Sequence, residues 1–494
     1  MQQLPYAFAR SNEIILTESG TACLITRATS LSSLAEAQRV AGTYLTPKKV
    51  SSEVFRQALE ETYRDSASDA AGAAEQANGH AEGASLTALA DDATGVDDLL
   101  DQRADAPVVR LINAILIEAI RARASDIHIE VEVDQLVVRF RVDGLLRAAL
   151  TSNRALAPQL ISRIKVMGKL DIAEKRLPQD GRVSLRVAEF HLDARISTIP
   201  AQHGERVVMR LLDRSQTRAG IETLGMSPST RTTFARLLNR PDGLLLVTGP
   251  TGSGKTTTLY AGLDALNTRE TNTMTIEDPI EYALPGIAQM QVNPATDLTF
   301  ARGLRAILRQ DPNVIMVGEI RDGETARIAV ESAMTGHLVL STLHTNSAIG
   351  SIARLIDLGV ERFLLAPMLR GVLAQRLVRR ICPDCAQQHP LSDAEASLLQ
   401  NRMQAGETSH AGAGCETCDG TGFKGRIALY HLVEITAGLE QGISNGLPES
   451  DLVALAHADG SGLLNDGIAK VREGLTTAQE VARVVFDTTH EAAQ

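Results

Sequence analysis

The stretch "LLLVTGPTGSGKTTTL", residues 244–259, carries the residue types of a phosphate-binding loop. It fits the pattern G-x-x-x-x-G-K-[ST] at Gly249, Gly254, Lys255 and Thr256. In this pattern, backbone N–H groups converge on phosphate at a helix N-terminus, the lysine reaches the β- and γ-phosphates, and the hydroxyl binds Mg²⁺. The run "LLLVT" predicts a buried strand before the loop and "TTTLYAGLDAL" predicts a helix after it, which is the context that the motif requires. We therefore predict an ATP and Mg²⁺ site whose phosphate-binding residues are Gly249, Pro250, Thr251, Gly252, Ser253, Gly254, Lys255, Thr256 and Thr257.

A second aliphatic run, "NVIMVGE", predicts a strand that ends on Glu319. Ligands of parallel sheets bind outside the carboxyl ends of the strands, so an acid at this point faces the phosphates. We predict that Glu319 positions or deprotonates the attacking water, with Lys255 as a second catalytic residue. The alternative is a solvated loop carboxylate.

Further acids and histidines flank the same region. "TIEDPIEY" places Glu277, Asp278 and Glu281 within five residues, and such acids repel one another unless a cation such as Mg²⁺–nucleotide lies among them. A solvated turn has the same composition. In "TGHLVLSTLHTN", His337 and His344 bracket a predicted buried strand, and His344 falls on the phosphate side. We take Glu277, Glu281 and His344 as catalytic candidates and Asp278 as a nucleotide-binding candidate, although single histidines are more often structural.

Four of the five cysteines form two CxxC pairs, Cys382 with Cys385 and Cys415 with Cys418, and 29 residues separate the pairs. Four thiolates at this spacing predict a tetrahedral Zn²⁺ site and favour structural zinc over a redox function. The fifth, Cys23, is expected in a hydrophobic core.

The run "QRLVRR", with Arg376, Arg379 and Arg380, precedes the first cysteine pair. A basic run beside zinc is compatible with nucleic-acid binding, but we expect a solvated helix end.

Composition narrows the class of protein. Hydrophobic residues make up 44% of the 494 residues, but aromatics make up only 3%, which counts against binding of single-stranded nucleic acid by stacking. The net charge of −11 is concentrated in residues 65–106, which hold ten acids and one base, so the remainder is close to neutral. No apolar run approaches the roughly 18 to 20 residues that span a bilayer. We expect a cytosolic protein whose membrane contact is peripheral or runs through a partner.

The pattern along the chain predicts several domains of α/β and α+β type. Residues 65–106 are rich in Ala, Gly, Ser and Asp and predict a flexible acidic linker. The linker separates a small module, in which "SLSSLAEAQRVAG" and "SSEVFRQALEETYRD" predict helices; by elimination we interpret the module as a docking domain, with a purely structural appendage as the alternative. Alternating strands and helices predict an α+β domain with two sheet regions, and repeated strand, loop and helix patterns then predict a parallel sheet. The predicted units are 1–64 (docking), 65–106 (linker), 107–213 (α+β), 214–223 (connector) and 224–494 (P-loop ATPase domain, with zinc module 381–423).

Taken in order, "GPTGSGKT", "TIEDPIEY", "VGEIRD" and "STLHTN", followed by the paired CxxC motifs, resemble the secretion-superfamily P-loop ATPases, and among them the GspE family of type II secretion ATPases. The stretches "LPYAFAR", "ASDIHIE", "RFRVDG" and "KLDIAEKRLPQDGR" support the resemblance from Leu4 onward. It implies a RecA-like motor with a zinc-binding insertion, preceded by a PAS-like domain. The acidic linker is the main departure.

The resemblance also implies a function. It implies a Mg²⁺-dependent ATPase that works as a homo-hexamer on the cytoplasmic face of the bacterial inner membrane and drives pseudopilus assembly for type II secretion. Residues 1–64 would dock on a bitopic membrane protein of the GspL type, and the motor would meet a polytopic protein of the GspF type. Arg195 and Arg210 would close over the nucleotide. Nucleotide or subunit contacts are implied for Arg305, Arg309, Arg321 and Arg354.

Three other functions share some of these features. A type IV pilus assembly ATPase would use the same chemistry for a different product. A nucleic-acid translocase would need a basic channel, which the near-neutral composition disfavours, and we expect no nucleic-acid partner. A nucleotide-binding switch would bind ATP without turnover, and Glu319 argues against it.

Overall fold

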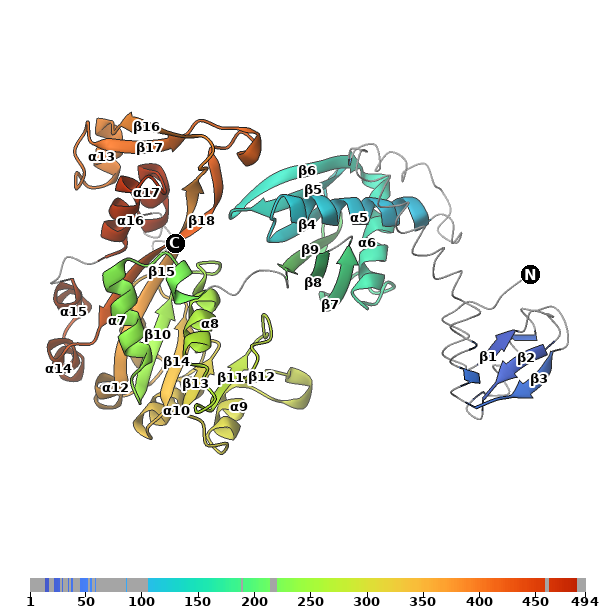
Figure 1. Cartoon of the computed structure of the whole chain (residues 1–494), viewed down its shortest axis with the longest axis horizontal. Coiled ribbons are helices and arrows are strands. Elements are labelled where there is room, and N and C mark those ends of the chain that lie inside the picture. The colour runs from blue at the N-terminus through green and yellow to red at the C-terminus, as the bar shows by residue number, and fades with distance from the viewer. Residues whose placement is uncertain are drawn as a thin grey trace.

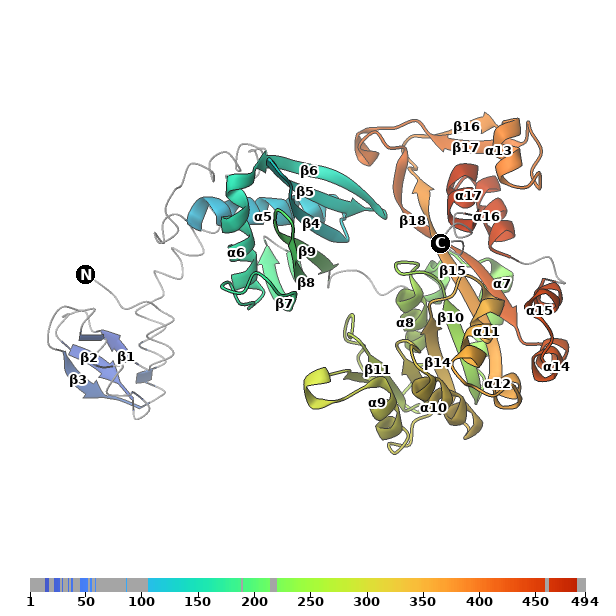
Figure 2. The same cartoon turned by 180° about the vertical axis from the view of Figure 1, so that it is seen from behind.

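The structure is a computed structural model, and Figures 1 and 2 show it from two sides. It describes most of the chain after Asp105 and short pieces before it: residues 14–16, 22–26, 29, 34, 37–38, 45–51, 54–55, 58, 86, 105–187, 190–213, 220–457 and 462–486. The described residues form a small N-terminal sheet, a second domain and a motor domain (Figure 1). The predicted mixture of α/β and α+β domains is confirmed. Within these ranges every helix is too short or too polar to cross a membrane.

The N-terminal module contains a three-stranded sheet that the sequence analysis did not predict. Its strands are β1 (Ile14–Leu16), β2 (Ala22–Ile25) and β3 (Thr46–Lys49). β2 pairs antiparallel with β1 and parallel with β3. Cys23 is fully buried in the small core, as predicted. The described residues inside the two predicted helices are helical, apart from Ser51, whose hydroxyl accepts from the Val54 N–H as a cap.

Most of the predicted linker lies outside the described residues, but Leu86 does not follow the prediction. It is helical, only 6% exposed, and belongs to the hydrophobic core of the second domain. The first helix of that domain, α5 (Asp105–Arg121), begins inside the predicted linker.

The second domain is one antiparallel sheet with two helices on one face. The two predicted sheet regions join because β4 pairs with β9, giving the strand order β6-β5-β4-β9-β8-β7. Helices α5 and α6 bury apolar residues such as Leu111 and Leu160 against the sheet. The elements after α5 are β4 (Asp126–Val131), β5 (Gln135–Val142), β6 (Leu145–Asn153), α6 (Ala157–Met167), β7 (Gln179–Val187), β8 (Phe190–Ala201) and β9 (Gly204–Asp213).

The motor domain is a seven-stranded sheet with helices on both faces (Figure 1). Its order is β12-β11-β13-β14-β10-β15-β18; the first six strands are parallel, and β18 runs antiparallel to β15. The strands are β10 (Gly243–Thr248), β11 (Thr273–Glu277), β12 (Ala288–Gln291), β13 (Val314–Val317), β14 (Leu338–Leu343), β15 (Leu369–Ile381) and β18 (Phe423–Glu434).

The run "LLLV" in β10 is buried on both faces because the strand is central. Leu244 and Leu246 enter the core on one face, and Leu245 and Val247 enter the core on the other. A continuous aliphatic run is therefore what this position requires. The helices that cover the two faces are α7 (Pro228–Leu238), α8 (Lys255–Leu266), α9 (Phe300–Ile307), α10 (Gly323–Met334), α11 (Ala348–Asp357) and α12 (Arg362–Met368).

The four-cysteine module is inserted between the adjacent strands β15 and β18. It comprises the hairpin β16 (Ala386–Pro390) and β17 (Thr408–Gly412), with α13 (Asp393–Leu398) between its strands. After β18 the chain forms α14 (Ala437–Asn445), α15 (Glu449–Ala456), α16 (Leu463–Arg472) and α17 (Ala478–Phe486). Helices α16 and α17 share a small core with α13 and the end of β15.

The basic run before the first cysteine pair was interpreted wrongly. "QRLVRR" lies inside strand β15, not at a helix end. Arg376 is buried, and Arg379 donates to the buried carboxylate of Glu480 at 2.8 Å while its guanidinium lies 4.1 Å from the Phe423 ring centre. Arg380 alone is exposed. The run is a part of the domain core, not a basic surface for nucleic acid.

Candidate functional site

The predicted phosphate loop lies between the end of β10 and the start of α8. Gly254 precedes the helix with φ +87°, a left-handed conformation that glycine adopts without strain. At Gly249 a Cβ atom would lie 2.4 Å from the carbonyl oxygen of Gln375, so no larger residue fits. Thr256 lies in the first turn of α8. The first N–H groups of a helix have no partners within the helix, so the start of α8 offers donors to a phosphate.

One atom of this loop supports the fit to a phosphate group. The hydroxyl oxygen of Ser253 is buried and has no hydrogen-bond partner among the described residues. Buried polar atoms are nearly always paired, so an unpaired one in this loop fits a site that a ligand oxygen completes.

Lys255 is folded back onto the loop. Its Nζ donates to the carbonyl oxygens of Gly249 at 2.7 Å and Pro250 at 3.1 Å. The pKa of Lys255 is lowered to about 8, chiefly by burial; the charge of Glu319 opposes the shift and the charge of Arg376 adds to it. Only 8% of Lys255 is exposed, so its charge is poorly hydrated and favours an anionic partner.

Glu319 and His344 meet Lys255 at one edge of the sheet, because they follow the neighbouring strands β13 and β14. The Glu319 carboxylate is 14% exposed; one oxygen lies 2.6 Å from Nη2 of Arg321 and the other lies 3.5 Å from Nε2 of His344. Burial, and then the nearby charge of Lys255, lower the pKa of His344, while Glu319 raises it. A neutral imidazole beside a carboxylate, a lysine and an arginine can donate or accept one hydrogen bond near the phosphates.

Glu277, a predicted catalytic candidate, lies at the end of β11 and is not part of a solvated turn. It is only 2% exposed and accepts hydrogen bonds from the Tyr260 hydroxyl, the Thr275 hydroxyl at 2.6 Å and the Gln289 amide at 3.1 Å. These three neutral donors stabilise the buried carboxylate. Asp278, the next residue, is exposed.

Three arginines of the second domain form a row that reaches Glu281. Arg182, Arg195 and Arg210 are direct cross-strand neighbours on β7, β8 and β9. Like charges in this arrangement repel, so the row favours an anion against it. Burial raises the pKa of Glu281, and the charges of Arg210, Arg195 and Arg182 lower it, so the row lies close to this carboxylate.

Further contacts fix this row in position. Arg182 Nη1 donates to Oε1 of Gln291 on β12 at 3.2 Å, which joins the second domain to the motor. Arg210 also pairs with Asp126 at 2.9 Å. The structure thus brings Arg195 and Arg210 to the loop that carries Asp278 and Glu281.

Other predicted residues lie away from this cluster. Arg305 pairs with Glu324 at 2.7 Å, Arg309 donates to the Arg305 carbonyl, and Arg354 is exposed on α11. Among the contacts of the described residues, none joins these three arginines to the phosphate loop. His337 bonds within its own turn, with Nδ1 2.9 Å from the Ser332 carbonyl oxygen, and is structural.

Sequence reasoning missed three residues of this site. Tyr260 was read only as part of a helix, although it links α8 to Glu277. Arg376 is 3% exposed beneath the phosphate loop, where it donates to the Asn346 carbonyl at 2.7 Å. Arg182 joins the arginine row. Its alternation with neighbouring residues in "DGRVSLRV" is a strand signal, but only the cross-strand register places it opposite Arg195.

The four cysteines form one cluster whose geometry suits zinc. Their sulfur atoms all lie within 4.8 Å of one another, with Cys382 to Cys415 at 3.9 Å, Cys385 to Cys418 at 3.8 Å and Cys415 to Cys418 at 3.7 Å. Sulfurs on a tetrahedron with arms of about 2.3 Å lie about 3.8 Å apart. Backbone N–H groups of Cys415 and Gly422 donate to the Cys418 sulfur at 3.2 Å, which favours a thiolate.

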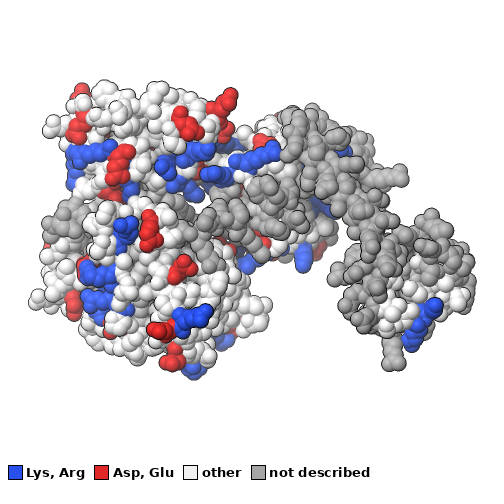
Figure 3. All heavy atoms as spheres, viewed as in Figure 1, with Lys and Arg blue, Asp and Glu red and all other residues white. Residues whose placement is uncertain are grey.

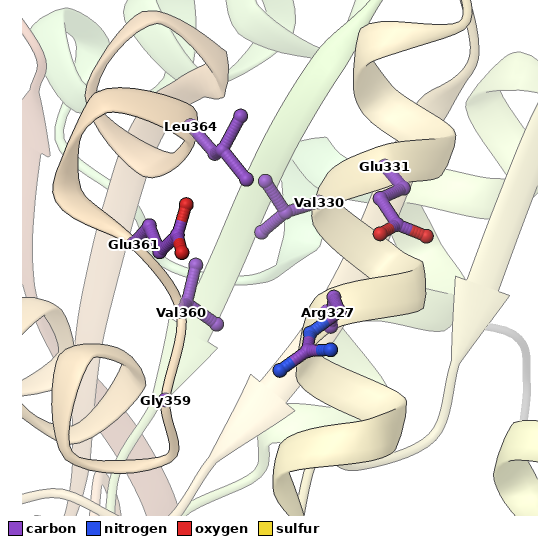
Figure 4. A pocket seen from close by; sticks show the side chains of 7 residues that line it. All are labelled: Arg327, Val330, Glu331, Gly359, Val360, Glu361 and Leu364. Atoms are coloured by element: carbon purple, nitrogen blue, oxygen red, sulfur yellow. The ribbon is translucent and has the colours of Figure 1, made fainter.

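A separate cavity of about 240 Å³ lies between α10 and the start of α12 (Figure 4). Its lining includes Arg327, Val330, Glu331, Glu361 and Leu364, and no predicted site residue. Two carboxylates beside one arginine disfavour phosphate, so this cavity is not a second nucleotide site.

Two family models match the chain. One, described as "Type II/IV secretion system protein", matches residues 101–483. The other describes an N-terminal domain of "GSPII protein E" and matches residues 3–63.

The chain is also similar to individual proteins over nearly its whole length. It is 51% identical to the type II secretion system protein E of Pseudomonas aeruginosa over 98% of this chain and 96% of that relative. The type II secretion system ATPase E of Vibrio cholerae is 46% identical over 98% of this chain and 97% of its own length.

Solved structures agree on the fold. The pilus retraction motor PilT with bound ADP has a TM-score of 0.51 and 27% identity, covering 75% of this chain and 95% of that chain. The Legionella pneumophila ATPase DotB has a TM-score of 0.56 and 20% identity, covering 77% and 95%, and shows the fold alone.

The lowered pKa of Lys255 generates a prediction for nucleotide binding. Because the pKa in the free protein is about 8, the ammonium that favours phosphate is lost as the pH rises through this value. We expect the dissociation constant for Mg²⁺–ATP to rise by up to about tenfold per pH unit above pH 8, while binding is nearly constant below it. Calorimetric titration across this pH range measures the change. Lys255→Arg is the control, because its guanidinium stays charged; an unchanged alkaline weakening in that variant would contradict the assignment.

The sulfur geometry generates a second prediction. Cys385→Ser should lower the zinc content from about one ion per chain to almost none and lower the melting temperature of the module, because three thiolates hold zinc far more weakly than four. Metal analysis by mass spectrometry and thermal unfolding measure both effects. Cys23→Ala, which alters a buried cysteine outside the cluster, should keep the wild-type zinc content. Full zinc occupancy in Cys385→Ser would refute the four-thiolate site.

Proposed function

The chain belongs to the type II/IV secretion system protein family, and from this premise we propose that it hydrolyses ATP to power type II protein secretion. The observation that carries the proposal is the meeting of Lys255, Glu319 and His344 at the carboxyl ends of β10, β13 and β14. These strands are neighbours in the sheet, so the three side chains surround one place in front of the phosphate loop.

In this proposal the loop binds the phosphates through its N–H groups, and Lys255 leaves its two carbonyl partners for the β- and γ-phosphates. Thr256 would hold Mg²⁺, which would supply positive charge against the transferring phosphoryl group. Glu319 orients and deprotonates the attacking water. The Glu319 oxygen that does not pair with Arg321 lies 3.5 Å from Nε2 of His344, and it is the one suited to this role. Glu277 is a positioning residue, since Tyr260 ties it to α8.

The arginine row would couple nucleotide binding to movement of the second domain relative to the motor. Arg195 and Arg210 reside on a different domain from the phosphate loop, so the attraction of nucleotide phosphates would draw the two domains together. Hydrolysis and phosphate release remove that attraction. A cycle of closing and opening in a homo-hexameric ring would drive assembly of the pseudopilus.

The same proposal assigns the protein's partners and its location in the cell. The N-terminal match at residues 3–63 supports a docking role toward a bitopic inner-membrane protein of the GspL type, with the motor facing a polytopic GspF-type protein at the cytoplasmic face of the membrane. This match also favours type II secretion over pilus assembly. Structural Zn²⁺ at the four cysteines completes the cofactor set with ATP and Mg²⁺.

Glu319→Gln tests the hydrolytic assignment. It should reduce ATP turnover by at least about 100-fold, because the amide does not accept a proton from water, while the dissociation constant for Mg²⁺–ATP changes by less than about threefold. Phosphate release and calorimetry measure the two quantities. Glu331→Gln, an exposed acid of the same domain, is the control and should keep wild-type turnover. Equal turnover in wild type and Glu319→Gln would favour a nucleotide switch without hydrolysis.

A second experiment tests the assignment to type II secretion and the docking role of residues 1–64. The full chain, tagged at its C-terminus, should retain a bitopic inner-membrane protein from detergent-solubilised membranes, and the chain without residues 1–64 should lose it while keeping ATPase activity. Mass spectrometry identifies the retained protein. Retention of pilus-assembly proteins alone would assign the motor to the other system.

A further inference from the structure

The tip of the β5–β6 hairpin carries a preformed turn. Asp143 and Gly144 connect the two strands with φ values of +50° and +90°, the conformation of a tight hairpin turn. Arg141 Nη1 donates to the Gly144 carbonyl oxygen at 2.9 Å, which holds the turn in place. The hairpin therefore ends in a rigid loop with one carboxylate.

This carboxylate contacts the motor domain beside the four-cysteine module. One Asp143 oxygen accepts a hydrogen bond from the Gly425 N–H at 3.0 Å, and the other lies 3.9 Å from Nε of Arg426. Arg147, on the same hairpin, lies 3.9 Å from Asp419, the residue after Cys418. The Asp143 side chain is only 17% exposed, although a carboxylate at a hairpin tip is ordinarily solvated.

The motor side of the contact offers a backbone donor and a positive charge, and Asp143 pairs with both. Gly425, at φ +77°, falls where the register between β15 and β18 shifts, so its N–H lacks a regular ladder position. Arg426 is the cross-strand neighbour of Arg379, and the charge of Arg379 is already balanced by Glu480. Figure 3 shows basic side chains gathered where the second domain meets the motor. One carboxylate here satisfies a backbone donor and a guanidinium.

The hairpin and the arginine row are parts of one hydrogen-bonded sheet. Arg141, two residues before Asp143, is the cross-strand neighbour of Asp126, and Asp126 is the neighbour of Arg210. The sequence of neighbours continues to Arg195 and Arg182, which contacts Gln291. The second domain thus contacts the motor at two places, the hairpin tip and the arginine row. Because both belong to one sheet, fixing the hairpin tip restricts the position of the arginine row.

We propose that Asp143 is a positioning residue that anchors the second domain to the strand leaving the four-cysteine module. Through this anchor the module orients Arg195 and Arg210 toward the nucleotide site. The inference rests on the proposed function, since it assigns a part of ATP binding to a residue distant from the phosphate loop.

Asp143→Gly tests the anchor, because glycine keeps the positive φ without strain and removes only the carboxylate. We expect the dissociation constant for Mg²⁺–ATP to rise about threefold to tenfold, the effect of losing one charge-assisted hydrogen bond at a partly exposed contact. Amide exchange should accelerate in residues 423–430 and also in residues 288–291 of β12. Asp143→Asn, which keeps an acceptor and tolerates the turn, should recover most of both effects. Arg147→Ala should shift both quantities in the same direction by a smaller factor.

Asp134→Ala is the matched control, since Asp134 lies exposed in the neighbouring β4–β5 connection. It should leave affinity and exchange unchanged. Zinc content and melting temperature show whether each variant is folded. Wild-type affinity and wild-type exchange in β12 for folded Asp143→Gly would overturn the anchor while leaving the proposed function intact. Absence of ATP turnover in the wild-type chain would instead overturn the proposed function.

Discussion

The parallel pairing of β10 with β14, and of β14 with β13, is the constraint on which the rest of the structure depends. Parallel strands end at the same edge, so the residues after them converge even though 64 positions separate Lys255 from Glu319 in the chain. The aliphatic residues that bury both faces of β10 stabilise this alignment. The chemistry of the ATPase site is thus a consequence of hydrophobic burial one layer below it.

Charge at the site is shared between the two domains. The motor contributes two acids of low exposure, Glu277 and Glu319, which accept hydrogen bonds from donors such as Tyr260 and Arg321. It also contributes the poorly hydrated Lys255. The second domain contributes a row of arginines that repel one another. Each side is incomplete electrostatically, and a polyphosphate between them relieves both. This complementarity supports the proposal that arginines of the second domain take part in a site whose loop lies entirely in the motor.

Local patterns predicted much of this, and long-range pairing explains what they missed. The phosphate loop, Glu319 and the two cysteine pairs could be predicted because each is marked by a short motif of adjacent residues. Arg376 was misread because a basic run in an edge-proximal strand resembles a solvated helix in sequence, and only its pairing with β10 and β18 buries it. Arg182 required the register of β7 with β8. Leu86 was not predicted to be buried, because the average composition of the surrounding acidic segment predicts a linker and gives no signal for one buried side chain.

The place of the four-cysteine module explains the long interval between its cysteine pairs. Cys382 directly follows β15 and Cys418 closely precedes β18, so both pairs lie at the base of an interrupted hairpin. The proposed zinc ion would crosslink the two pairs at that base and close the loop between them whatever its length, because the entropic cost of closing a loop grows only slowly with added residues. The segment between the pairs is therefore free to lengthen or shorten, or to acquire new elements such as α13, without disturbing the sheet. Insertions and deletions between the two cysteine pairs should therefore be tolerated, because β15 and β18 stay paired below them.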